Sequence, residues 1–415
     1  MAFSRRDLPV SDERPRIVYV SYDGAGEPLG RSQVLAYLQR LAPSCGITLV
    51  SFEKDHASRA ETSGLLSQAG IAWRALSYHK RPPVLSTLYD VLVGARAVRR
   101  ACRVTDADIV HVRSYVPALI ALLAAWPGRR RWRLLFDIRG FWADERVLGG
   151  GWAPGGVLYR VVKRCERWFF AETDAVVTLT AASIPQIRSW LGPRDVPVVV
   201  IPTCAEVERY RDAVPRPDGP RAIWCGSIGS CYRFDLAVRF ATALGLPFTV
   251  LTRQVESARM QLGDMAADVR EVSHGDVAAE LRPGDIGICF LTPSFADLAR
   301  APTRIAEHLA AGMVVAVTPR IGDLDGIVEA GGLGVSVADE SDAGLASAAA
   351  RALALASDPD VQARARRVAR ELYSVDDGAA AYLELYRRLP QGSSAAGVGF
   401  EAKLRRGPAP TAAAH

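Results

Sequence analysis

Apolar runs and amphipathic stretches alternate along the first half of the chain. Runs of strand length occupy residues 17–21, 48–52, 109–112, 134–137, 175–178 and 198–201. Stretches with helical spacing of apolar positions lie between them, at 32–41, 85–102 and 157–172. Strands that alternate with helices build β/α units around a parallel sheet, so the pattern predicts an α/β fold.

A second series follows a segment rich in Pro and Gly at 215–220. Its predicted strands are 222–225, 248–251, 286–290 and 314–317, with helices at 235–244 and from Thr303 to the terminator Gly312. An Ala-rich helical region and a last amphipathic helix at 379–389 come next. The predicted units are a flexible tail (1–15), a Rossmann-like domain (16–205), a linker (206–220), a second Rossmann-like domain (221–372), a terminal helical segment (373–389) and a disordered tail (390–415).

Length and composition agree with a two-domain enzyme. The 415 residues exceed what one hydrophobic core usually supports, and 49% hydrophobic with 23% charged residues is ordinary for a soluble protein. The longest apolar run, 116–126, is too short to cross a bilayer, and the polar segment 1–15 lacks the apolar core of a secretory signal. The seven cysteines show no pairing at metal-site spacing, so we expect reduced thiols and a cytoplasmic protein.

Positive charge is concentrated in the first half. The net charge of +6 is modest, but Lys and Arg crowd the segment 80–133. This asymmetry favours an anionic partner, either a membrane surface or a phosphate-bearing acceptor, and the alternative is a solvated basic face. Nucleic acid is disfavoured because the segment lacks interleaved stacking aromatics.

The helix that begins at Thr303 carries the most informative chemistry. Free N–H groups and the dipole at its first turn favour an anion, and Thr303 and Arg304 add a hydroxyl and a cation there. Glu307 lies one turn further on the same face, where a carboxylate can accept from a vicinal diol. A nucleotide-sugar needs this arrangement, and the alternative is an exposed Arg/Glu ion pair.

The segment 301–317 resembles the signature of family 4 retaining glycosyltransferases of the GT-B class. The family pattern is a Glu, seven residues, a second Glu, small residues, Gly and an apolar strand. Glu307 matches the second Glu, while Ala299 stands at the position of the first. The resemblance implies that Glu307 contacts the donor ribose. It also implies a GT-B fold with an acceptor-binding first domain, a nucleotide-sugar-binding second domain and a terminal helix that crosses back to the first domain.

A glycine-rich loop at 23–33 follows the first predicted strand. Missing Cβ atoms let such a backbone approach a diphosphate. Its spacing is also close to a dinucleotide-binding fingerprint with Glu53 as the ribose ligand, which leaves an NAD-dependent epimerase or dehydrogenase as an alternative. By resemblance, Gly30 and Arg31 face the donor's phosphate and sugar.

Two arginines stand where the family commonly has histidines. His111 is kept and is expected to be a core residue, but Arg113 takes the place of the second histidine, and Arg139 follows the strand at 134–137. Arginines at these positions indicate charge stabilisation of a phosphate or of an anionic acceptor, so both are candidate catalytic and acceptor-binding residues. Nearby acidic side chains are candidate acceptor-hydroxyl contacts, with loop capping as the alternative: Asp137, Asp144 and Glu145.

The loop 226–233 in the second half also suits a diphosphate. Its glycines, its hydroxyls and Arg233 follow a predicted strand. The family usually has an Arg directly after Gly226 and a Lys six residues on, positions that Ser227 and Arg233 occupy here. We therefore predict a donor-binding set with Arg233 also catalytic: Gly226, Ser227, Arg233, Thr252, Arg253, Val277, Thr303, Arg304 and Glu307.

No metal or cofactor is expected. Three Asp-x-Asp triplets occur, at 106/108, 323/325 and 358/360, but none follows a long strand of a nucleotide domain. The sequence thus predicts a retaining hexosyltransferase that uses a nucleotide diphosphate-sugar and a hydroxyl acceptor in bacterial polysaccharide or glycolipid assembly, at the inner membrane face. A soluble natural-product acceptor and a non-catalytic nucleotide-sugar-binding homologue remain as alternatives.

Overall fold

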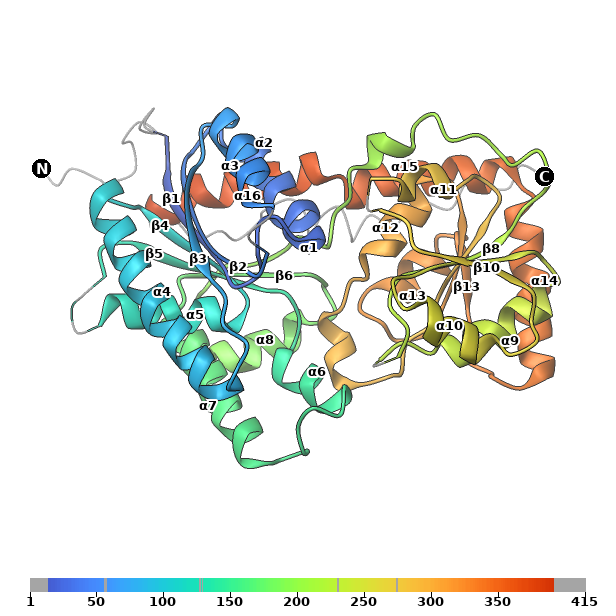
Figure 1. The fold of residues 1–415 in the computed structure, drawn as a ribbon, viewed down its shortest axis with the longest axis horizontal. Coiled ribbons are helices and arrows are strands. Elements are labelled where there is room, and N and C mark those ends of the chain that lie inside the picture. The colour runs from blue at the N-terminus through green and yellow to red at the C-terminus, as the bar shows by residue number, and fades with distance from the viewer. Residues whose placement is uncertain are drawn as a thin grey trace, which may run out of the picture.

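A computed structural model of the chain contains two β-sheets, each built of parallel strands and covered by helices on both faces (Figure 1). It describes residues 14–55, 58–126, 128, 130–229, 231–273 and 275–391. The predicted tails, 1–15 and 390–415, fall almost wholly outside these residues.

The first sheet has seven strands in the order β3-β2-β1-β4-β5-β6-β7. In that order the strands are β3 (Ala72–Ser77), β2 (Gly46–Glu53), β1 (Arg16–Ser21), β4 (Ile109–Arg113), β5 (Arg133–Ile138), β6 (Ala175–Thr178) and β7 (Val198–Val200). The helices of this half are α1 (Pro28–Gly30), a π-helix (Arg31–Leu35), α2 (Ala36–Leu41), α3 (Arg59–Gln68), α4 (Pro83–Thr105), α5 (Tyr115–Ala125), α6 (Trp142–Leu148), α7 (Val157–Glu172) and α8 (Ile184–Leu191).

The central strands of this sheet are apolar because both of their faces are covered. Helices α4, α5 and α7 pack on one face through residues such as Val98, Ile120 and Phe170. Helix α2 packs on the other face through residues such as Leu38.

The second sheet has six strands in the order β10-β9-β8-β11-β12-β13. These strands are β10 (Ala267–Arg270), β9 (Phe248–Leu251), β8 (Ala222–Cys225), β11 (Ile286–Cys289), β12 (Val314–Val317) and β13 (Gly334–Ser336). The helices of this half are α9 (Phe234–Leu244), α10 (Val255–Leu262), α11 (Val277–Glu280), α12 (Thr303–Ala310), α13 (Leu324–Val328), α14 (Asp342–Ala356) and α15 (Pro359–Tyr373), with short 3-10 turns at Val207–Tyr210, Phe295–Ala299 and Leu389–Gln391.

The last helix, α16 (Val375–Arg388), leaves the second half and packs on the first sheet beside α2 (Figure 1). It starts one turn earlier than the predicted residue 379, because the Ser374 side chain caps it by accepting a hydrogen bond from the Asp376 N–H. Gly378 lies in this helix, and a Cβ there would lie only 2.9 Å from the Tyr37 ring and 3.0 Å from Cys204 Sγ. The missing side chain lets α16 approach α2 closely at this position.

The sequence pattern located the central strands and the edge strand β7, and missed the other three edge strands. Strands β6, β8, β9 and β12 have the predicted bounds, and the other predicted strands differ by at most two residues at either end. Strands β3, β10 and β13 lie at sheet edges, where β3 and β10 are largely open to solvent. Such strands carry mixed side chains, so they lack the continuous apolar run that marks a buried strand.

The two halves make direct polar contacts as well as sharing helix α16. The carboxylate of Asp323, at the start of α13, accepts hydrogen bonds from the backbone N–H groups of Ala181 (2.7 Å) and Ala182 (2.9 Å). Ala296 and Ala299 are buried within the core cluster of the first sheet. Among the described residues, no helix has the length and apolar content that crossing a bilayer requires.

Candidate active site between the two domains

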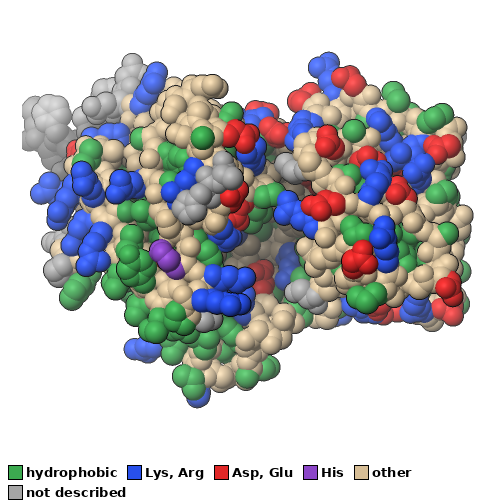
Figure 2. Space-filling view, in the orientation of Figure 1, with side chains coloured by type: hydrophobic (Ala, Val, Ile, Leu, Met, Phe, Trp, Pro, Cys, Tyr) green, Lys and Arg blue, Asp and Glu red, His purple; other side chains and the backbone are tan. Residues whose placement is uncertain are grey.

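A cavity of about 590 Å³ lies between the two sheets, at the carboxyl ends of their strands. Ligands of open parallel α/β sheets bind at this end. The first domain contributes Arg113 and Arg139, and the second contributes residues 300–303 that lead into α12. Figure 2 shows a hollow between the halves with Lys and Arg side chains along its edges. We refer to this space as the cleft.

The glycine-rich loop is closed on itself by Glu53. The Glu53 carboxylate, which is 2% exposed, accepts hydrogen bonds from the N–H groups of Ala25 (2.9 Å) and Gly26 (3.4 Å). It is therefore not available to bind a ribose, which removes the residue on which the dinucleotide-binding alternative depended. Asp23 and Leu29 of this loop line the cleft.

The two predicted donor contacts of this loop lie apart from the cleft lining. Gly30 is buried at the end of α1. The Arg31 guanidinium forms a bidentate ion pair with Glu61 of α3, at 2.9 and 2.6 Å, and its Nε donates to the Gly26 carbonyl. In this conformation Arg31 braces the loop against α3.

Asp137 is a structural carboxylate and not an accessible acceptor contact. It is 2% exposed, accepts a hydrogen bond from the Tyr382 hydroxyl (3.0 Å), and lies 3.6 Å from Arg139 Nη1 and 3.5 Å from His111 Nε2. Burial alone raises the pKa of Asp137, but the attraction of Arg139 and the groups around it outweighs burial and holds the pKa at about 2. Asp137 is not part of the cleft lining and faces Arg139 from beneath, an arrangement that suits positioning of Arg139 better than the predicted contact with an acceptor hydroxyl.

His111 is a core histidine, as predicted. It is 1% exposed, its Nδ1 lies 2.6 Å from the Tyr386 hydroxyl, and its ring packs against Tyr19 and Tyr382. Burial lowers the pKa of His111 against the opposing pull of Asp137, so the ring is neutral. Helix α16 thus supplies two tyrosine hydroxyls to the residues directly beneath the cleft.

Arg113 and Arg139 both line the cleft, but only Arg139 is paired. Arg139 faces Asp137 and donates from Nη2 to the Gln33 side-chain oxygen at 3.3 Å. Arg113 is 5% exposed, and it forms no ion pair or hydrogen bond through its guanidinium with any residue that the structure describes.

The two remaining acidic candidates, Asp144 and Glu145, differ in their surroundings. Asp144 accepts hydrogen bonds from Tyr159 (2.9 Å) and Lys163 (3.2 Å), so it holds α6 against α7 and does not line the cleft. Glu145 does line the cleft and lies 3.8 Å from Arg300 of the second domain. Burial raises the pKa of Glu145, with Arg300 opposing it. Glu145 and Arg300 form an ion pair between the two domains.

The first turn of α12 holds a partly buried cation, Arg304, without a carboxylate partner. The Arg304 guanidinium carbon lies 4.5 Å from the centre of the Tyr232 ring and 5.6 Å from that of Trp224. Its Nη1 is buried with no hydrogen-bond partner, and no ion pair joins Arg304 to any described residue. Glu307 lies one turn on, where burial raises its pKa to about 7 although Arg304 and Arg209 oppose the rise. Thr303 lines the cleft, whereas Arg304 and Glu307 follow it in the helix and are not part of the cleft lining.

Other members of the predicted donor set are spread over the second domain. Ser227 is exposed, and the buried Thr252 hydroxyl accepts from the Gln254 N–H at 3.1 Å. The exposed Arg253 lies 3.5 Å from Glu271, and Val277 belongs to the core at the start of α11. Ala299, at the position of the first family Glu, is fully buried against the first domain and leaves no polar group there.

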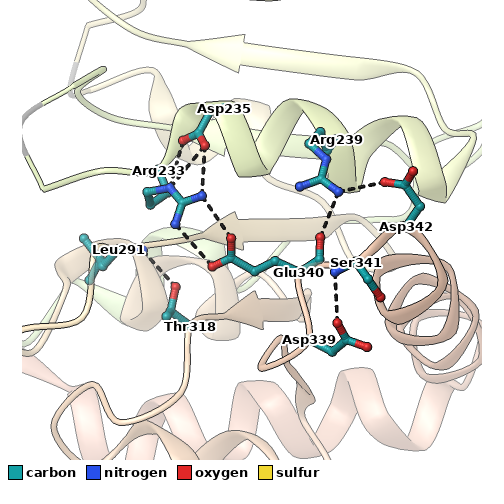
Figure 3. Close-up of polar contacts among 9 residues, drawn as sticks. All are labelled: Arg233, Asp235, Arg239, Leu291, Thr318, Asp339, Glu340, Ser341 and Asp342. Carbon is teal, nitrogen blue, oxygen red and sulfur yellow. Dashed lines mark hydrogen bonds and ion pairs between the residues drawn. The ribbon is translucent and has the colours of Figure 1, made fainter.

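The structure does not bring Arg233 into the cleft lining. Its guanidinium forms ion pairs with Asp235 and with Glu340, both at close to 3 Å, and caps the region between α9 and the segment before α14 (Figure 3). With two carboxylates on one guanidinium, Arg233 carries no spare positive charge for a diphosphate in this conformation.

Comparison with known proteins identifies the first domain. Residues 12–204 match the family model described as glycosyl transferase 4-like domain. The first domain belongs to that family. A search of curated proteins finds no match to the sequence.

Solved structures establish the fold as GT-B. Sucrose-phosphate synthase from Thermosynechococcus elongatus and a glycosyltransferase from Rickettsia africae each superpose with a TM-score of 0.66 at 14% identity, over 92% of this chain and 100% of theirs. HepE from Anabaena, in complex with UDP and glucose, superposes with a TM-score of 0.61 at 12% identity, over 89% of this chain and 99% of its own. These structures confirm the predicted α/β fold of the GT-B class. The predicted glycosyltransferase is confirmed by the glycosyl transferase 4-like match over residues 12–204.

Sequence reasoning missed several residues of the cleft in this glycosyltransferase. Arg300 and Tyr232 line it from the second domain, and Lys54, Trp142 and Arg146 line it from the glycosyl transferase 4-like domain. Arg300 directly precedes the Ala-Pro that starts α12, so an extra arginine just ahead of the helix was the available signal. The others come from separate loops that meet only in the folded protein.

Proposed function

We propose that this glycosyltransferase transfers a hexose-type sugar from a nucleotide diphosphate-sugar to a hydroxyl group of its acceptor, with retention of configuration at the anomeric carbon. The observation that carries the donor assignment is the partly buried Arg304 at the start of α12, which has no carboxylate partner among the described residues and whose Nη1 is buried without a hydrogen bond. A buried cation is costly unless an anion pairs with it, and a helix N-terminus is itself an anion site. Together they suit a diphosphate.

Glu307 completes the donor site in this proposal. Its carboxylate lies one helical turn beyond Arg304, where it can accept hydrogen bonds from the two ribose hydroxyls. At Gly226 the backbone of the loop can come close to the diphosphate because no side chain is present. The φ of +136° and the position of Arg304 leave no space for one. The structures of HepE that contain UDP and UDP-glucose support a nucleoside diphosphate donor of this kind.

In the proposed reaction the acceptor oxygen attacks the anomeric carbon on the face that the diphosphate leaves. The bond from the anomeric carbon to the phosphate oxygen breaks, the bond to the acceptor oxygen forms, and the departing phosphate takes the acceptor proton. Arg304 and the N–H groups of α12 stabilise the charge that develops on the diphosphate. We further propose that the enzyme needs no metal, because this cation and helix terminus supply the positive charge at the leaving group.

For the acceptor, we propose a lipid-linked or other glycan intermediate of bacterial polysaccharide or glycolipid assembly, met at the cytoplasmic face of the inner membrane. Support comes from the amino-terminal half of α4, where Val84, Leu85 and Leu88 are 68%, 66% and 52% exposed. Arg96 and Arg100 follow on the same helix. Apolar side chains next to arginines suit an anionic lipid surface.

Calorimetric titration with UDP, GDP, ADP and NAD tests the donor proposal. We expect one nucleoside diphosphate to bind and NAD not to bind. Tight binding of NAD alone would instead favour the epimerase or dehydrogenase alternative. The sugar nucleotide of the base that binds is then supplied with candidate acceptors, and the anomeric configuration of the product is read by NMR. Binding without hydrolysis or transfer would point to a non-catalytic nucleotide-sugar-binding protein.

A further inference from the structure

The floor of the cleft carries more positive than negative charge. Two guanidinium groups, Arg113 and Arg139, stand beside a single buried carboxylate, Asp137, and the neighbouring His111 is neutral. Asp137 lies within 3.6 Å of Arg139, which also binds Gln33. The charge of Arg139 is therefore matched inside the protein, and that of Arg113 is not.

Arg113 is the feature that needs an explanation. It is 5% exposed and its Nε is buried without a hydrogen-bond partner, yet it lines the cavity. Across the described part of the chain, no carboxylate forms an ion pair with it. A buried guanidinium left unpaired is unfavourable, which makes such a group a sign of a missing ligand.

The donor diphosphate does not account for this charge. Arg304, on the second domain, is already an unpaired cation at a helix N-terminus, whereas Arg113 ends strand β4 of the first domain on the other side of the cleft. Arg146 also lines the first-domain wall and forms no ion pair within the described residues; its guanidinium lies 5.3 Å from the centre of the Trp142 ring. The first-domain wall thus combines unpaired arginines with an aromatic ring on which a sugar can pack.

We propose that the acceptor of this glycosyltransferase carries a carboxylate or phosphate group, and that Arg113 binds this group. A guanidinium fork matches either anion with two parallel hydrogen bonds. This inference rests on the proposed function, because that proposal assigns the first-domain wall of the cleft to the acceptor. It makes Arg113 a residue that determines acceptor specificity.

The test compares three probes that share one sugar: methyl glucoside, methyl glucuronide and glucose 6-phosphate. Their affinities are measured by NMR titration, with and without UDP, GDP or ADP, whichever binds. Wild-type protein is expected to prefer at least one anionic probe to the neutral glucoside by about tenfold or more, the range of a charge-assisted hydrogen bond. A preference for glucuronide alone or for the sugar phosphate alone identifies which anion the site takes.

Arg113→Gln is expected to abolish the preference, and Arg113→Lys to keep part of it. Arg351→Gln, which removes one exposed charge from α14, is the matched control and should change nothing. High salt should reduce the preference of the wild-type protein for the anionic probe, and this measurement needs no variant.

Three results would overturn the inference. The first is that the anionic probes bind wild-type protein no better than the neutral glucoside, or do not bind, and the second is that the preference survives in Arg113→Gln. The third is that Arg113→Gln loses affinity for UDP, or loses more affinity for UDP-glucuronate than for UDP-glucose. The last result would assign Arg113 to the donor. Failure of the proposed function gives a different result, because then no nucleoside diphosphate binds. The probe titrations of the protein without nucleotide still measure whether Arg113 binds an anion.

Discussion

The Arg304 guanidinium lies directly over the α-carbon of Gly226, so that a Cβ on residue 226 would come 2.1 Å from Arg304 Nη2. Glycine at this position and the cation of the donor site are therefore one structural unit. The backbone of Gly226 also has a φ of +136°, a value that residues other than glycine rarely adopt.

Gly226→Ala is expected to weaken nucleotide binding by about tenfold or more, or about 1.4 kcal/mol, because the added methyl group displaces Arg304. Gly229→Ala is the matched control: it lies in the same loop with a φ of +83°, but nothing is within 4 Å of its Cβ position. Calorimetry on both variants separates backbone strain from displacement of Arg304. Equal losses in the two variants would contradict the proposed unit.

Glu307 predicts a pH dependence of nucleotide binding. Its pKa is about 7 without ligand, because burial raises it, and only the ionised form accepts both ribose hydroxyls. Affinity should therefore rise as the pH increases through about 7, and Glu307→Gln should remove this rise after correction for the titration of the nucleotide itself. Glu307→Ala should weaken binding by roughly 1 to 3 kcal/mol. A pH profile that is the same in the wild-type protein and in Glu307→Gln would show that Glu307 does not bind the nucleotide.

The raised pKa of Glu307 also predicts how the stability of the folded protein changes with pH. Between pH 4.5 and 7 the folded protein keeps the Glu307 proton that the unfolded chain has lost, so this residue makes folding less favourable as the pH rises through that range. The Tm of Glu307→Gln relative to wild type should thus increase from about pH 5 to about pH 8. Thermal unfolding without nucleotide measures the difference.

Arg304→Ala and Arg233→Ala are expected to differ, although the sequence assigns a donor role to both. Arg304 is unpaired, and its loss should cost about 1 to 3 kcal/mol of nucleotide affinity and slow transfer in a single-turnover assay. Arg233 is occupied by the exposed Asp235 and the partly exposed Glu340, so its loss should lower stability by less than about 1 kcal/mol and leave affinity almost unchanged. An equal loss of transfer in both variants would show that Arg233 leaves these partners when the donor binds.

Tyr382→Phe tests whether α16 positions the cleft arginine. Removing the hydroxyl that donates to Asp137 should lower kcat with little change in nucleotide affinity, because Asp137, the partner of Arg139, loses a hydrogen bond that fixes its position. Tyr37→Phe is the control, since this buried hydroxyl bonds to backbone groups of residues 202 and 204 and not to Asp137. Both variants should lose about 1 kcal/mol of stability, and only Tyr382→Phe should lose activity. Equal activity in the two variants would leave Asp137 without a positioning role.

Liposome co-sedimentation tests the membrane part of the proposal. The protein should pellet with anionic vesicles at low salt and less at high salt, and Leu85→Glu should weaken this binding. Met260→Glu, at an apolar residue on α10 of the second domain that is 78% exposed against 66% for Leu85, should not. Protein that ignores anionic vesicles at low salt would favour the soluble-acceptor alternative.

The sequence by itself determined the buried strands, the two-domain order and the chemistry of α12. These are local properties: a parallel strand covered on both faces must be apolar along its length, and a helix start with Thr303 and Arg304 followed by Glu307 is legible from spacing alone. Edge strands β3 and β10 escaped because solvent on one side relaxes that constraint.

Only the tertiary structure decided which charged residues are free. Arg31, Arg233 and Arg139 look equivalent to Arg113 and Arg304 in the sequence, but the first three meet Glu61, Asp235 with Glu340, and Asp137. Asp137 in turn is held by Tyr382, a residue 245 positions away. Charge compensation depends on distances of a few ångströms between elements that are far apart along the chain, and the packing of helices on sheets sets those distances.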